Sequence, residues 1–117
     1  MKNYIYVENG DDEVGAADDA VLFPAANITR IDPVDATNTL VSFDAADGTA
    51  DTDKIVITHA SGKCAEVANA VIKMAQGRPR NGFTAMALFN TTGAVESFPI
   101  NNLDSSIVVT NIQYTAS

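Results

Sequence analysis

Tryptophan is absent from the 117 residues, aromatic residues make up 7%, and cysteine and histidine occur once each. With Cys64 alone, no disulfide can form within the chain, which favours a reducing compartment or a virion. With His59 alone, a metal site built from several histidines is excluded. The core must therefore be mostly aliphatic, with five phenylalanines as its largest pieces.

Basic residues are also scarce, with seven lysines and arginines against fifteen acids and a net charge of −8. Residues 1–53 hold twelve of the acids and two of the bases. An acidic half of this kind repels phosphate, so binding to nucleic acid or to anionic membranes is not expected. The asymmetry would allow contact between the acidic part of one copy and the basic part of another.

Long apolar runs are missing, because no stretch approaches the roughly 20 residues that span a bilayer. The sequence opens with Met1-Lys2-Asn3 and a strand-like run, without the pattern of a signal peptide. We therefore expect no membrane partner and no secretion by a signal peptide. The length predicts a single domain over residues 1–117.

Short segments rich in β-branched and aromatic residues predict strands, separated by turns rich in Gly, Asn and Asp. We expect the Ile28–Ile31 segment to be broken at Asp32-Pro33, and Ala45–Asp53 to form a hairpin loop. The predicted strands are Tyr4–Val7, Ala20–Phe23, Ile28–Ile31, Thr39–Asp44, Lys54–Thr58, Phe83–Phe89, Val95–Ile100 and Ser106–Tyr114.

One segment differs from these strands, because its apolar residues recur with the spacing of an α-helix. They are Cys64, Val67, Ala68, Val71, Ile72 and Ala75. This stripe predicts one amphipathic helix at about 62–76, with Ser61 as its N-cap and Gly77 just past its end. The predicted fold is therefore α+β and mostly antiparallel. Its sheet is curled or forms a small, partly open barrel of the Sm or SH3 type, with a flat sheet plus helix as the alternative.

Catalytic signatures are weak. His59 and Cys64 lie five residues apart, and a thiol at a helix start can be activated by a nearby imidazole. Cys64 begins the apolar stripe, however, so we interpret it as a core residue. We expect no enzyme, no catalytic residue and no cofactor.

Two clusters could bind ligands. Asp44, Asp47, Asp51 and Asp53 crowd one loop and are weak candidates for Ca²⁺, although their spacing does not match an EF-hand, and a solvated acidic turn is the preferred interpretation. The weak nucleic-acid candidates are Lys73, Arg78, Arg80 and Phe83, since cations beside an aromatic ring can hold single strands.

Several features together resemble a known group of proteins. They are Tyr4-Ile5-Tyr6 at the start, Phe23-Pro24 after an acidic linker, the hairpin loop around Asp47, and Lys63…Glu66-Val67…Ala70-Val71 in the helix. This layout is similar to that of small, acidic, uncharacterised proteins of marine bacteriophages, some grouped with virion structural genes. The resemblance implies a structural or accessory protein, located in a virion or in the cytoplasm of an infected bacterium.

We therefore expect a non-enzymatic structural or interaction protein that works as a homo-oligomer, with other virion proteins as further partners. Small β-rich domains can assemble by pairing their edge strands. The alternative is an Sm-like RNA-binding module, in which the segment Arg78–Phe83 would contact bases.

Overall fold

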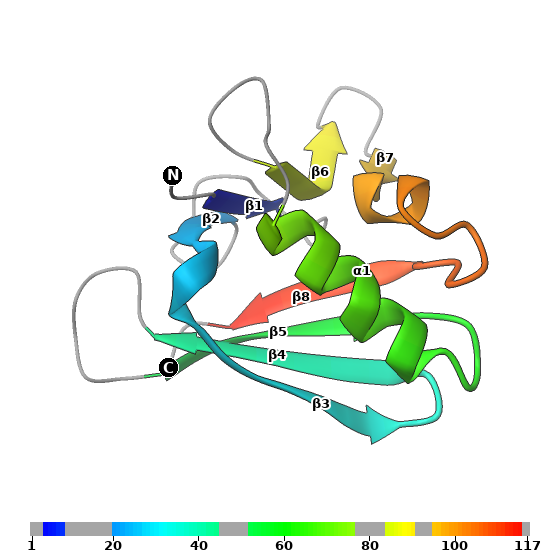
Figure 1. Ribbon diagram of the computed structural model, residues 1–117. Helices are drawn as coiled ribbons and strands as arrows, with labels where there is room; N and C mark the ends of the chain where they lie inside the picture. Colours follow the sequence, from blue (N-terminus) through cyan, green and yellow to red (C-terminus); the bar gives the residue numbers. More distant parts are fainter. Residues whose placement is uncertain (1–3, 9–19, 45–51, 77–83, 91–94, 116–117) are drawn as a thin grey trace.

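Strands dominate the computed structural model of this chain, which describes residues 4–8, 20–44, 52–76, 84–90 and 95–115. The described strands form two four-stranded sheets that are not closed into a barrel (Figure 1). The α+β class and the mostly antiparallel pairing are confirmed. We call the sheets A and B.

Sheet A has the order β2-β1-β6-β7, with β1 (Tyr4–Glu8), β2 (Ala20–Pro24), β6 (Thr84–Asn90) and β7 (Val95–Ser97). Its central pair, β1 and β6, is parallel, and the other two pairs are antiparallel. The β1–β6 register shifts by one residue beside Met86. Met86 and Ala87 are therefore both buried, although neighbours in a regular strand point to opposite faces.

Sheet B has the order β3-β4-β5-β8 and is antiparallel throughout. Its strands are β3 (Ile28–Asp35), β4 (Asn38–Asp44), β5 (Thr52–Thr58) and β8 (Asn111–Thr115). The predicted strands Thr39–Asp44 and Lys54–Thr58 are confirmed, and their alternate residues Val41, Phe43, Ile55 and Ile57 are fully buried.

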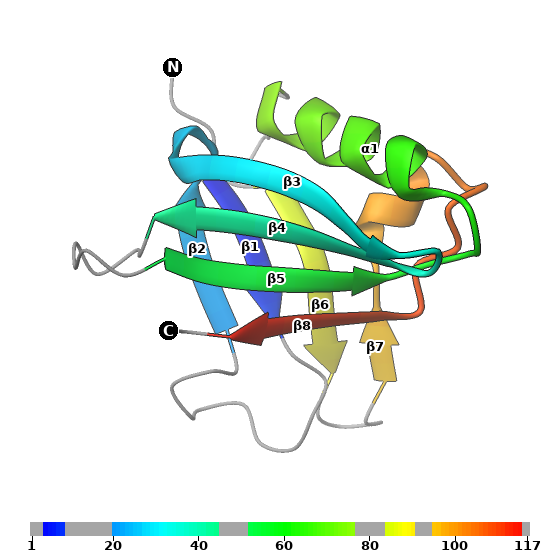
Figure 2. The same cartoon turned by 90° about the horizontal axis from the view of Figure 1, so that it is seen from below.

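The core lies between the two sheets, whose strands cross when the molecule is seen from below (Figure 2). Phe23 from β2 stacks on Phe43 from β4, with ring centroids 3.9 Å apart and planes within 9°. This pair joins sheet A to sheet B within a mostly aliphatic core. Two short 3₁₀ helices, η1 (Ala25–Asn27) and η2 (Pro99–Asn102), follow β2 and β7.

The predicted helix is confirmed as α1 (Cys64–Gln76), but it begins later than position 62. Gly62 has a φ of +77°, a left-handed conformation that cannot belong to a right-handed helix. Ser61 lies in the turn before it, so its assignment as N-cap was wrong. The helix runs beside β3 and covers the open side of the sandwich (Figures 1 and 2).

The predicted break at Asp32-Pro33 is wrong. Pro33 does not end the strand, and β3 continues to Asp35, where a tight turn leads into β4. Proline is tolerated because β3 has a strand neighbour on one side only among the described elements.

The last predicted strand begins at Asn111 rather than Ser106. Val108 has a φ of +46°, so the backbone leaves the extended conformation there. This break changes the phase of burial, from Ile107 and Val109 to Ile112 and Tyr114. A continuous strand could not bury both pairs on one face.

Candidate functional site

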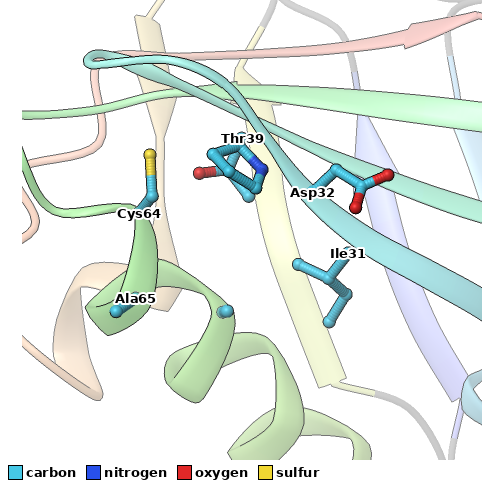
Figure 3. A pocket seen from close by; sticks show the side chains of 7 residues that line it. Ile31, Asp32, Thr39, Cys64 and Ala65 are labelled. Carbon is cyan, nitrogen blue, oxygen red and sulfur yellow. The ribbon is translucent and has the colours of Figure 1, made fainter.

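A cleft of about 290 Å³ lies between α1 and the edge strand β3. Its lining is mostly apolar and comes from three elements: β3, β4 and the first turns of α1. The lining residues are Ile31, Asp32, Pro33, Thr39, Cys64, Ala65 and Ala68. Figure 3 shows Ile31 on the α1 side of β3, with the carboxylate of Asp32 turned away from the helix.

The cleft forms because the apolar surface of α1 is wider than the part of the helix that packs against the core. Its buried residues are Val67, Ala70, Val71 and Met74, so the helix is rotated relative to the predicted stripe. Ala68 is half-buried on the cleft wall, and Ile72, one turn further on the same face, is 46% exposed. We call Cys64, Ala65, Ala68 and Ile72 the cleft flank of α1.

Two turns position the cleft, the β3–β4 turn and the β5–α1 connection. Thr37 and Ala36 accept hydrogen bonds through their carbonyl oxygens from the backbone N–H groups of His59 and Gly62, each at 2.8 Å. The Cys64 thiol donates to the carbonyl oxygen of Asp35 at 3.3 Å. These three bonds fix the start of α1 against the end of β3.

A buried histidine lies behind the cleft. His59 is 4% exposed, and its Nδ1 lies 2.8 Å from the carbonyl oxygen of Ala60. A carbonyl can only accept, so Nδ1 carries the proton and Nε2 of the neutral ring accepts. The Thr39 hydroxyl, 2.9 Å from Nε2, supplies that donor. Both ring nitrogens are therefore satisfied within the fold.

The Cys64 thiol is a poor match for a catalytic pair. Its Sγ is 3.8 Å from Nε2 of His59, whereas Thr39 already occupies the single lone pair of that nitrogen at a shorter distance. The prediction that Cys64 belongs to the core was only half right, because it is half-buried and lines the cleft. The thiol is thus held at the cleft wall by its hydrogen bond to a backbone carbonyl.

Charge around the cleft is arranged unevenly. Arg30 pairs with Asp32 on β3, and Lys63 pairs with Glu66 at 3.8 Å. Asp35 has no ion pair within the described part of the chain. The backbone N–H of Thr37 and the side chain of Asn38 donate to it, which lowers the pKa of its exposed carboxyl. It thus leaves a negative charge at one end of the cleft.

The two weak ligand clusters predicted from the sequence are only partly described. Asp44 lies in β4 and Asp53 lies in the neighbouring strand β5, but their side chains face opposite sides of sheet B. Asp53 is paired with Phe43 and points inward, whereas Asp44 is exposed. Asp47 and Asp51 lie outside the described residues. Within the described ranges, no three His, Cys, Asp or Glu side chains gather closely enough to hold a metal ion.

Of the four nucleic-acid candidates, Lys73 alone is described, and it is exposed on α1. Arg78, Arg80 and Phe83 lie outside the described residues.

The buried polar contact between Asp53 and Tyr114 was not predicted either. Asp53 is 5% exposed, and its carboxylate accepts a hydrogen bond of 2.9 Å from the Tyr114 hydroxyl. The Tyr114 ring stacks near Phe43 at a centroid distance of 6.2 Å. The signal in the sequence was an acid at an inward position of β5, two residues before Ile55. We interpret this hydrogen bond as one that stabilises the pairing of β5 with β8.

The described residues therefore form an α+β fold with two crossed sheets, one α-helix and an apolar cleft at a sheet edge. Comparison with family models, curated proteins and solved structures finds no match for this chain. In the described ranges, no helix has the length and apolar character needed to cross a membrane.

Proposed function

We propose that this protein is a non-enzymatic structural or interaction protein that binds other polypeptides, first of all copies of itself, through its sheet edges. The observation that carries the proposal is β3, an eight-residue strand with one strand neighbour, β4, among the described elements. Most of its residues from Thr29 to Asp35 are exposed, and Val34 is 58% exposed. Unpaired edges of this kind are the sites where sheets of separate chains join.

The polar groups near the cleft support binding rather than catalysis. His59 uses both ring nitrogens inside the fold, and the Cys64 thiol donates to a backbone carbonyl. A catalytic site needs a nucleophile and a base that are free to act on a substrate. The resemblance to small acidic phage proteins supports a place in a virion, where an assembling protein needs no catalytic group.

Light scattering after size-exclusion chromatography tests self-association. One chain has a mass of 12.3 kDa. We expect a larger mass that depends on concentration, and a smaller one for Val34→Lys, which adds a charge to the β3 edge. Thr110→Lys, at another exposed position, is the matched control. A mass of one chain at every concentration up to about 1 mM would contradict self-association.

The RNA-binding alternative gains no support from the described residues. It depends on the segment Arg78–Phe83, which lies outside the described residues. A titration with single-stranded RNA at two salt concentrations tests it, since phosphate contacts weaken as salt rises.

A further inference from the structure

We propose that the cleft between α1 and β3 binds one extended polypeptide segment, which adds to β3 as a strand and inserts aliphatic side chains against the cleft flank of α1. The segment carries small aliphatic residues at every second position and a lysine or arginine near one end. This inference rests on the proposed function, because it names the class of partner that the sheet edge accepts.

The backbone of β3 supplies the first half of the site. An added strand would lie about 4.8 Å beyond β3, at the usual spacing within a sheet. Pro33 offers no N–H, so the hydrogen bonds must come mainly from the Ile28–Asp32 part of the strand. Alternate side chains of the added strand would point to the α1 side, as Ile31 does.

The helix supplies the second half. Figures 1 and 2 show α1 lying above sheet B and beyond its β3 edge, so an added strand would lie beneath the helix. Ala65 and Ala68 leave space there, and Ile72 extends the apolar wall by one turn. Because α1 overhangs the β3 edge, the strand added there must be an extended segment with no helix beside it.

The volume of the cleft fits side chains better than a small-molecule ligand. About 290 Å³ is at the lower limit of ligand pockets, which span about 300–1,000 Å³. The lining offers the Thr39 hydroxyl and the Cys64 thiol as its uncharged polar groups, and both already have partners. Recognition must therefore come from apolar contact and from the backbone of β3.

Charge selects the type of segment. Asp35, next to the start of α1, is ionised and has no cation beside it among the described residues, whereas Asp32 and Glu66 are paired. The whole chain carries a net charge of −8, so an acidic segment would be repelled. A cation that reaches Asp35 complements the one unpaired acid at the cleft.

Selection from a random library of displayed ten-residue peptides tests this inference. The immobilised wild-type chain is compared with Ala68→Arg, which fills the cleft with a long cation, and with Asn69→Arg, which adds the same charge on an exposed face. We expect wild type and Asn69→Arg to enrich peptides with alternating aliphatic residues and a cation. Binding of a synthetic copy should fall at least tenfold in Ala68→Arg.

Alkylation of Cys64 gives an independent readout of the same site. We expect the synthetic peptide to slow labelling of this thiol by iodoacetamide in proportion to occupancy, because the thiol lines the cleft. A scrambled peptide of the same composition, which loses the alternation, should leave the labelling rate unchanged.

The outcomes separate this inference from the proposed function. Self-association with no peptide enriched over Ala68→Arg, or with enriched peptides that do not protect Cys64, would overturn the cleft site and leave the proposed function standing. A monomeric chain that still binds the peptide would overturn self-association and support the cleft. Failure of both would remove the two proposals together.

Discussion

The two flanks of α1 are both apolar, yet they differ in what they contact. The core side consists of Val67, Ala70, Val71 and Met74, all of them buried members of the core. The cleft flank has similar chemistry, but Ile72 is 46% exposed and Ala65 is exposed. Burial on the core side stabilises the fold, whereas apolar surface left in water gives no such stability. The comparison separates residues that the fold needs from residues available for a partner.

Shortening a core-side residue should have the largest effect. Met74→Ala should lower the free energy of unfolding by about 2–5 kcal/mol, because it removes buried methylene groups and leaves a cavity. Chemical denaturation measures this change. Lys73→Ala, one residue away and exposed, is the control and should change stability by less than about 0.5 kcal/mol. Equal losses for the two variants would contradict the assigned rotation of α1.

The floor of the cleft can be tested at Thr39, which is 1% exposed. Thr39→Val keeps the shape but removes the hydroxyl that donates to Nε2 of His59, leaving a buried acceptor without its donor. Stability should fall by about 1–3 kcal/mol. Thr39→Ser keeps the hydroxyl and should lose less. If the two variants were equally stable, the hydrogen bond would not be what holds His59.

A substitution of Val108 tests whether an exposed apolar residue outside the cleft matters for stability. It is 52% exposed and has a left-handed backbone conformation, which is unfavourable for a β-branched residue. Val108→Asn should raise the free energy of unfolding by about 1 kcal/mol, because asparagine tolerates this conformation. Thermal unfolding measures the gain. A loss of stability would show that the valine side chain makes a needed contact.

Ile72 should show the opposite balance to Met74. Ile72→Ala should change stability by less than about 0.5 kcal/mol, since the side chain is nearly half exposed. Affinity for the selected peptide should fall about three- to tenfold, because apolar contact area is lost. Fluorescence anisotropy measures the affinity. Unchanged affinity would place the bound segment away from this turn of α1.

Asp35 should give the smallest effect, which shows as a change in the pH dependence of stability. Its folded pKa is lowered by hydrogen bonds from Thr37 and Asn38, so its contribution to stability is present above the unfolded pKa near 3.8. That contribution is lost as pH falls through the lower, folded pKa. Asp35→Asn should therefore lose less stability than wild type between pH 5 and about pH 2.5. Denaturation at both pH values measures the difference, and parallel losses would contradict it.

Much of the fold could be predicted because its signals are local. β-branched and aromatic residues identified β4 and β5 as strands, and helical spacing identified α1. The cleft could not be predicted, because the spacing of apolar residues in α1 does not indicate which side of the helix packs against the core. The Thr39–His59 hydrogen bond was missed for a similar reason, since it joins residues 20 positions apart.

By itself, the sequence determined the α+β class, the aliphatic core and the existence of one amphipathic helix, since each follows from composition and spacing along the chain. Tertiary structure alone decided the rotation of α1, the passage of β3 through Pro33 and the break at Val108. In each case the outcome depends on which neighbour lies alongside. Burial and strand pairing are set by elements distant in the chain, and no local pattern encodes them.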